Sequence, residues 1–195
     1  MRLFVALDIP DDVRSALAAF TATLRPACRN ARWVRIEGLH VTLKFIGEKP
    51  IEIMEEIKHF LSGIRSESFE ITFRGYGFFP TAKAARVFWV GIESGPQLSS
   101  LAKAVDAATS ALGIPKEDHP FAPHLTLARG GGRSGAPRWH KGDATNKNFQ
   151  HLQEKLAALP TPDFGTMAAH EFFLYQSQLS AGGSRYTKIA SFALK

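Results

Sequence analysis

The spacing of apolar residues along the chain predicts both helices and strands. Four stretches carry apolar side chains three and four residues apart, as one side of a helix does; they begin near Asp11, Pro50, Leu98 and Phe149. In the second of these, the inner side is expected to hold Ile53, Ile57, Phe60 and Leu61. Eight shorter stretches are continuously apolar or alternate apolar with polar, as strands do; they cover 3–7, 31–36, 40–46, 69–73, 86–92, 124–128, 168–176 and 185–194.

Neighbouring predicted strands are often joined by short links, which favours antiparallel pairing and an α+β class. No break in composition marks a linker, so we expect one domain over residues 1–195. The nearest candidate for a linker is the polar, glycine-rich stretch 130–146. We expect a loop there instead, because the strands that follow are needed to complete a sheet.

Composition narrows the class of protein further. The chain has 195 residues, of which 45% are hydrophobic, and a net charge of +6. A basic surface attracts phosphate groups, whether on nucleic acid, nucleotides or an anionic membrane. The single cysteine, Cys28, excludes an intramolecular disulfide and a thiolate metal cluster. No apolar stretch is long enough to span a bilayer, and Asp8 and Pro10 interrupt the apolar start without a signal-peptide cleavage pattern. We therefore expect a cytoplasmic protein without a membrane partner.

The most informative feature is a repeated motif. His40-Val41-Thr42-Leu43 returns 84 residues later (124 − 40 = 84) as His124-Leu125-Thr126-Leu127. Both copies fall in predicted strands, where side chains two positions apart share a face. Each strand therefore presents an imidazole and a hydroxyl on one face and two apolar side chains on the other. One such copy is common by chance on a half-buried strand, but two copies in similar strands indicate a function.

This set of side chains suits displacement at phosphorus. The attacking and leaving oxygens lie on opposite sides of the phosphorus, and each needs a partner for its proton. Histidine suits both roles because its unperturbed pKa, about 6.5, lies near neutral pH. Threonine hydroxyls, with an arginine or lysine, can hold the non-bridging oxygens. A metal site would favour histidines four residues apart on a helix, or a carboxylate among the ligands. Neither motif has an acidic residue on its histidine face, so we expect no metal and no cofactor.

At these residues the chain resembles the two-histidine (2H) phosphoesterase superfamily, and within it the bacterial and archaeal RNA 2′,3′-cyclic phosphodiesterases, also called 2′–5′ RNA ligases. The paired H-x-T-hydrophobic signature is met at His40/Thr42 and at His124/Thr126. The blocks that carry the resemblance are 2–10, 39–48, 123–129, 174–177 and 185–187, so it covers nearly the whole chain.

The resemblance implies a bilobal fold in which two pseudo-symmetric antiparallel sheets face a central cleft, with helices outside. It implies hydrolysis of a cyclic phosphate to a 2′-phosphate without a cofactor, possible RNA ligation, and an RNA end or a nucleotide cyclic phosphate as partner. His124 would activate water and His40 would protonate O3′, although two near-identical motifs do not by themselves assign these roles. Arg129 and Tyr186 carry over as substrate-binding residues.

Two residues next to the motifs raise separate questions. Arg129 lies two residues after Leu127 and four after Leu125. In a regular strand its side chain would therefore point to the core, as theirs do. We expect the strand to end or bulge near Ala128, which would turn Arg129 to the cleft. Phe45 follows the first motif and could flank a base, with core packing as the other interpretation.

Three alternatives stay open. The substrate could be a small nucleotide or ADP-ribose cyclic phosphate, or the protein could bind RNA ends without catalysis. The stretch 130–146 and its flanking residues could track a single strand by charge and stacking; the residues concerned are Arg129, Arg133, Arg138, Trp139, Lys141, Lys147 and Phe149. We expect a monomer.

Overall fold

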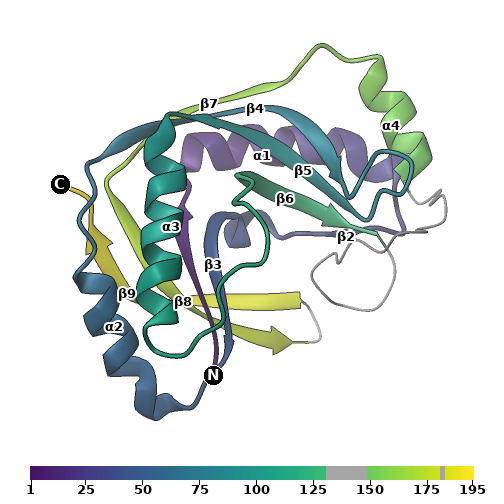
Figure 1. Cartoon of the computed structure of the whole chain (residues 1–195). Helices are drawn as coiled ribbons and strands as arrows, with labels where there is room; N and C mark the ends of the chain where they lie inside the picture. The colour runs from purple at the N-terminus through teal and green to yellow at the C-terminus, as the bar shows by residue number, and fades with distance from the viewer. Residues whose placement is uncertain (131–148, 181–182) are drawn as a thin grey trace.

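Two antiparallel sheets, set face to face, form the centre of the molecule (Figure 1). The structure is a computed structural model that describes residues 1–130, 149–180 and 183–195. The first sheet has the strand order β3-β1-β8-β9, with β1 at Arg2–Asp8, β3 at His40–Glu48, β8 at Glu171–Ser180 and β9 at Gly183–Ala193. The second has the order β2-β6-β5-β4-β7, with β2 at Arg32–Trp33, β4 at Phe69–Phe79, β5 at Val87–Ser94, β6 at His124–Arg129 and β7 at Asp163–Ala169.

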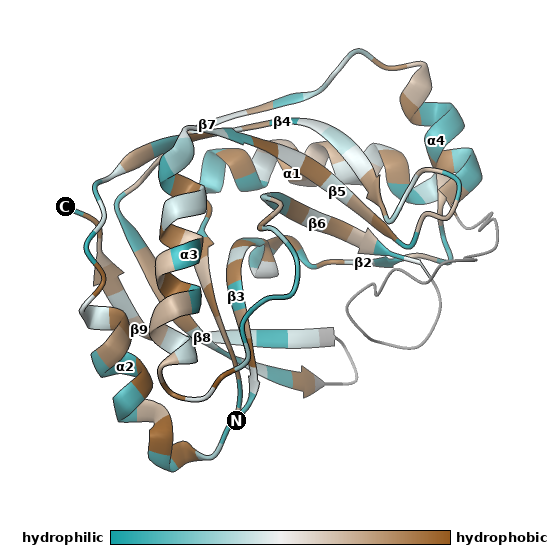
Figure 2. Ribbon diagram, viewed as in Figure 1, coloured by the Kyte–Doolittle hydropathy of each residue, from teal (hydrophilic) through white to brown (hydrophobic). Residues whose placement is uncertain are grey.

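Helices cover the outer sides of the sheets. The α-helices of the described residues are α1 at Asp11–Leu24, α2 at Met54–Ser62, α3 at Pro96–Ser110 and α4 at Gln150–Ala157. The described residues also form three short 3₁₀ helices. η1 at Arg25–Ala27 lies between α1 and β2, η2 at Ile36–Gly38 between β2 and β3, and η3 at Ile51–Ile53 between β3 and α2. Apolar segments, brown in Figure 2, run along the strands and along part of each helix. The main core lies between these apolar helix sides and the sheets. The expected α+β class with two antiparallel sheets and outer helices is therefore confirmed.

Both halves of the chain contribute to each sheet. The N-terminal strands β1 and β3 share a sheet with the C-terminal strands β8 and β9, and β7 pairs with β4 in the other sheet. The strands after the stretch 130–146 do complete both sheets, as expected. That stretch, apart from residue 130, lies outside the described residues.

Three sequence-based expectations about the elements were wrong. The strand expected at 31–36 is only two residues long, because the chain turns into η2 at Ile36. The strand expected at 168–176 is two strands, β7 and β8, with a break at His170. Most of β7 was missed because its buried positions do not alternate regularly. Phe60 is 39% exposed, since it lies at the edge of the apolar stripe of α2, whose buried residues are Met54, Ile57 and Leu61.

A buried lysine ties the first motif strand to the helix layer. Lys44 is 2% exposed, and its ammonium donates hydrogen bonds to Asp106 Oδ1 and to the Pro115 carbonyl oxygen, each at 2.6 Å. Glu117 Oε1 lies 3.5 Å from the same nitrogen. A buried charge is tolerated only when it is paired and hydrogen-bonded in this way. These contacts hold β3 against α3 and the segment that follows it.

Candidate active site

The two motif strands have the same burial pattern. In β3, His40 and Thr42 are half-buried, and Val41 and Leu43 are buried. In β6, His124 and Thr126 are half-buried, and the leucines between and after them are buried. The strands belong to different sheets and approach each other between them. The tertiary structure thus turns the histidine–threonine faces of the two repeats toward the same inter-sheet region.

Each motif strand has a bulge at the same position. Along β1, Ala6 pairs with Thr42 and Val5 with Lys44, so Leu43 has no partner. Along β5, Trp89 pairs with Thr126 and Phe88 with Ala128, so Leu127 has none. An extra residue in one strand reverses the parity of all that follow it. The expected bulge that frees Arg129 is therefore confirmed.

The bulge at Leu43 in β3 likewise moves Phe45 to the face of β3 that carries His40 and Thr42. Phe45 and Arg129 occupy equivalent positions in the repeats, since 45 + 84 = 129. The Phe45 side chain is 53% exposed, so the core-packing interpretation was wrong. Its ring centroid lies 6.1 Å from that of Phe4. One repeat thus places an aromatic ring, and the other a cation, on the same strand face as its histidine.

A backbone carbonyl two residues upstream orients each imidazole. Nδ1 of His40 lies 2.7 Å from the Gly38 carbonyl oxygen, and Nδ1 of His124 lies 2.8 Å from that of Ala122. A carbonyl oxygen only accepts hydrogen bonds, so each Nδ1 carries the proton and donates it. Nε2 of each ring can then act as an acceptor when the ring is neutral and as a donor when it is charged.

His40 lies in an aromatic cluster on the first sheet. Its ring centroid is 4.6 Å from that of Phe4, 5.0 Å from that of Tyr186 in an edge-on contact, and 6.1 Å from that of Tyr175. Burial in this cluster lowers the pKa of His40 to about 4, although the Gly38 carbonyl and the Asp8 carboxylate act in the opposite direction. Tyr186, expected on the substrate side, is half-buried and contacts this histidine.

His124 has an aromatic setting of its own on the second sheet. Phe79 contacts it edge-on with centroids 4.9 Å apart, and Trp89 lies 6.4 Å away. Burial lowers the pKa of His124, and the Ala122 carbonyl opposes the shift. The Trp89 indole lies over Gly77, where a Cβ atom would come within 2.1 Å of the ring. A glycine is therefore required beneath the tryptophan that borders His124.

The two histidines differ in their neighbours, because only His40 has the carboxylate of Asp8 opposite it on the adjacent strand. The sequence motifs did not indicate this contact. Asp8 pairs with His40 between β1 and β3, so the two side chains share a face. Its carboxylate accepts hydrogen bonds from the Ile9 amide and the Arg14 guanidinium, and it forms an ion pair with Lys188. The equivalent partner of His124 is Gly91, where a Cβ atom would lie 2.4 Å from the Arg74 carbonyl oxygen.

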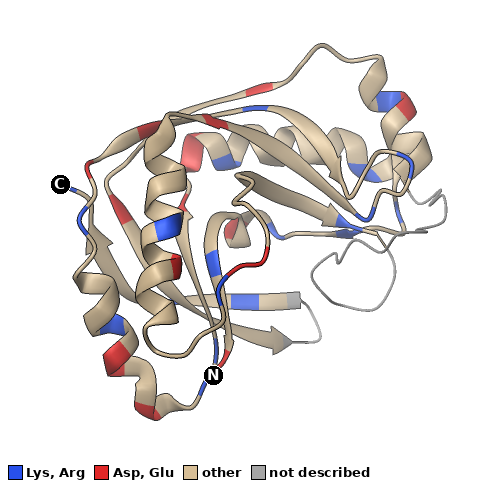
Figure 3. Ribbon diagram, in the orientation of Figure 1, with Lys and Arg blue, Asp and Glu red and all other residues tan. Residues whose placement is uncertain are grey.

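Arg129 connects the two sheets electrostatically. It lies close enough to both His40 and His124 to lower the pKa of each. Burial, Arg32 and Arg2 lower the pKa of Arg129 itself, and Tyr186 opposes them. Arg32 belongs to β2, whereas Arg2 and Tyr186 belong to the first sheet. A half-buried guanidinium among these groups, and near both imidazoles, is suited to an anionic ligand. Figure 3 shows basic residues gathered near the ends of β2 and β6.

Residues 1–130, 149–180 and 183–195 contain no group of three or more His, Cys, Asp or Glu side chains that could hold a metal ion. In the same residues no helix is long and apolar enough to cross a membrane. Phe149 is buried and so does not offer a ring for stacking. The other basic and aromatic residues of the stretch after Gly130 lie outside the described residues.

Two facing sheets that each present a histidine and a threonine define the site of a two-histidine phosphoesterase. A model of the family described as LigT like Phosphoesterase matches the chain twice, at residues 7–89 and 90–186, with one motif in each match. The chain belongs to this family.

Relatives and solved structures agree with this assignment. The chain is 31% identical to the RNA 2′,3′-cyclic phosphodiesterase of Methanothermobacter thermautotrophicus over 100% of this chain and 99% of that protein. It is 30% identical to the Escherichia coli K12 protein of the same name, over 99% and 96%. A crystal structure from Thermus thermophilus superposes with a TM-score of 0.76 at 30% identity, over 100% and 98%. The structure of E. coli LigT with 3′-AMP superposes with a TM-score of 0.75 at 28% identity, over 99% and 97%.

Proposed function

We propose that this protein hydrolyses RNA 2′,3′-cyclic phosphate ends to 2′-phosphates, with His40 and His124 as its acid/base pair. The observation that carries the proposal is the matched presentation of two imidazoles, each with Nδ1 bonded to a carbonyl and a threonine on the same strand face. Full-length relatives near 30% identity are named for this activity.

His124 acts as the base and His40 as the acid. Water attacks phosphorus and passes a proton to Nε2 of His124, while the P–O3′ bond breaks and O3′ takes a proton from Nε2 of His40. The Asp8 carboxylate supports this assignment, because a negative charge beside His40 favours its protonated form. His124 has a glycine in place of that carboxylate.

The negative charge of the substrate favours protonation of the histidines. Burial lowers the pKa of both imidazoles, so the charged form of His40 is disfavoured in the free protein. The anionic cyclic phosphate raises both pKa values when it binds, and Asp8 directs the proton toward His40. Arg129, Thr42 and Thr126 donate to the non-bridging oxygens as their charge builds. The chemistry needs no cofactor or metal ion.

The substrate's sugar and base face the first sheet in this proposal. Phe45 is exposed on the His40 strand and offers its ring to the terminal base, while Tyr186 lies near both His40 and Arg129. If the 5′-hydroxyl of a second RNA replaced water, the same groups would form a 2′–5′ linkage, which is the ligation we assign as a side reaction.

We further propose a single bilobal domain that acts as a monomer in the cytoplasm. Both histidines come from one chain, so no second copy is needed to complete the site. The single cysteine fits a reducing compartment.

A direct assay tests the proposal. Purified protein should convert an oligoribonucleotide with a 2′,3′-cyclic end to the 2′-phosphate product. His40→Ala and His124→Ala should each lower kcat by about 10²–10⁴-fold, the usual contribution of a positioned acid or base. His59→Ala, on a helix away from both motif strands, is the matched control. Near-normal turnover in either motif variant would refute the two-histidine scheme.

A further inference from the structure

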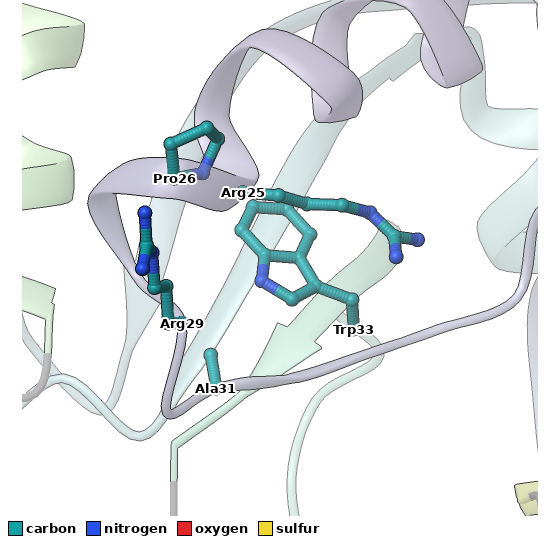
Figure 4. Close-up of a pocket in the computed structure, with 5 residues that line it drawn as sticks. All are labelled: Arg25, Pro26, Arg29, Ala31 and Trp33. Carbon is teal, nitrogen blue, oxygen red and sulfur yellow. The ribbon is translucent and has the colours of Figure 1, made fainter.

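A basic hollow lies at the edge of the second sheet (Figure 4). Its volume is about 480 Å³, and it is formed where the chain leaves α1, passes through η1 and enters β2. The described residues that line it are Arg25, Pro26, Arg29, Ala31 and Trp33. None of these five is acidic, and two are arginines.

The hollow combines a held aromatic ring with positive charge on two sides. The Trp33 indole N–H donates a hydrogen bond to the Cys28 carbonyl oxygen at 3.1 Å, and this bond orients the ring. The Arg25 guanidinium lies over the ring, 5.7 Å from its centroid. Arg29 stands on the other side of the hollow (Figure 4). Aromatic rings that stack on bases, together with cations that meet phosphates, are the usual means of binding single-stranded nucleic acid.

The hollow is joined to the candidate active site by one short strand. Arg32 precedes Trp33 and pairs directly with Arg129 between β2 and β6. Paired residues share a face of the sheet, so Arg32 extends the positive charge of Arg129 to the edge strand on the histidine face. Arg32 also lies close enough to lower the pKa of Arg129. Trp33, the next residue along β2, points to the opposite face and contacts the buried Phe88, so the hollow lies around the β2 edge of the sheet from the histidine face.

Distance along β6 places the hollow beyond the reacting nucleotide. His124 and Arg129 pair with Gly91 and Val87 of β5, which are four residues apart (91 − 87 = 4), and this corresponds to about 13 Å along a strand. A terminal nucleotide bound at the histidines does not fill that length together with the hollow on the next strand. The hollow therefore suits a nucleotide on the 5′ side of the cyclic end.

We propose that this hollow is a second RNA-binding subsite, which holds a base and backbone phosphate upstream of the cyclic end. The inference rests on the proposed function and deepens it, because it makes an oligonucleotide, and not a small cyclic nucleotide, the preferred substrate. Arg29 and Arg25 bind phosphate oxygens, and Trp33 with Arg25 provides the stacking surface.

The test compares two substrates in three proteins. Hydrolysis of a mononucleotide 2′,3′-cyclic phosphate and of a hexaribonucleotide with the same cyclic end is measured in the wild type, in Arg25→Ala/Arg29→Ala, and in Arg65→Ala. Arg65 is an exposed arginine near the end of α2, remote from β2, and serves as the charge control.

The wild type should have a higher kcat/KM for the hexanucleotide than for the mononucleotide. The double variant should lose about 10-fold or more of the hexanucleotide kcat/KM and keep the mononucleotide value. For the hexanucleotide, the slope of log kcat/KM against log salt concentration should also become shallower by about 1.4 in the double variant. Each of the two lost phosphate contacts with a single strand contributes about 0.7 to that slope. Arg65→Ala should resemble the wild type on both substrates.

Two results would overturn the subsite. One is an equal loss on both substrates, which would indicate a structural role for Arg25 and Arg29. The other is an unchanged hexanucleotide rate in the double variant. If the wild type hydrolysed neither substrate, the proposed function itself would be wrong, so the two failures are distinguishable.

Discussion

Replacing Asp8 tests which histidine is the acid. Asp8→Asn keeps a side-chain oxygen for the Ile9 amide and the Arg14 guanidinium but removes the charge beside His40. Loss of that charge should lower the pKa of His40, since the carboxylate favours the imidazolium. His124, opposite Gly91, has no such neighbour on its partner strand and should change little.

The size of the shift follows from the pairing of β1 with β3. Directly opposed residues have Cβ atoms about 5 Å apart, so the two charge centres are about 6 Å apart. Coulomb's law then gives about 0.7 kcal/mol in water and about 2.8 kcal/mol at an effective dielectric constant of 20. One pKa unit corresponds to about 1.4 kcal/mol, so these limits are about 0.5 and 2 units. Arg14 and Lys188 offset part of the Asp8 charge, which places the expected shift at about 0.5–1 unit.

The assay is the pH dependence of kcat at a saturating concentration of a cyclic mononucleotide, which reports the pKa values of the enzyme–substrate complex, where the bound phosphate raises both imidazole pKa values. The wild-type profile should be bell-shaped, because one imidazole must be neutral while the other is protonated. In Asp8→Asn the alkaline limb, where the acid loses its proton, should move to lower pH by about 0.5–1 unit. A shift confined to the acid limb would reverse the roles of the histidines, and no shift of either limb would refute the tuning by Asp8. Lys188→Gln, which removes a cation that faces Asp8, should move the alkaline limb in the opposite direction.

Three further predictions concern the motif residues. Thr42→Val and Thr126→Val should each lower kcat by about 10- to 10³-fold, if each removes one donor to a non-bridging oxygen; an unchanged kcat would exclude the threonines from that role. Activity should persist in excess EDTA, and a loss that one divalent ion restores would contradict the metal-free mechanism. The free energy of unfolding should fall as pH drops from 6.5 toward 4, because His40 binds a proton more readily in the unfolded chain than in the folded one. The contribution is on the order of 3 kcal/mol, and denaturant titrations of His40→Gln should show a correspondingly weaker dependence over this pH range.

Local sequence pattern was sufficient for most of the fold. The longest helix and the motif strands carry a clear period, so they were found near their observed bounds. The exceptions are elements whose pattern is weak. Strand β7 has two exposed residues side by side, and β2 is only two residues long before η2 begins. Such short or irregular strands are stabilised by their neighbours in the sheet more than by their own alternation.

The sequence by itself determined which groups we propose to react. The two H-x-T motifs, 84 residues apart, identify the imidazoles and hydroxyls, and strand periodicity places each pair on one face. In a regular strand the side chain of Arg129 would point into the apolar core, where an arginine is costly to bury. The sequence therefore also predicted the bulge before Arg129.

Only the tertiary structure decided the surroundings of those groups. Asp8 lies beside His40 because β1 pairs with β3 in one particular register, and a shift of one residue would turn it to the other face. Phe79 and Trp89 border His124 because β4, β5 and β6 are neighbours in the sheet, although both residues lie at least 35 positions before His124 (124 − 89 = 35). The pKa values of the histidines depend on burial and on nearby charges, and both are set by packing between strands that are distant along the chain. A single sequence carries no local signal for such contacts.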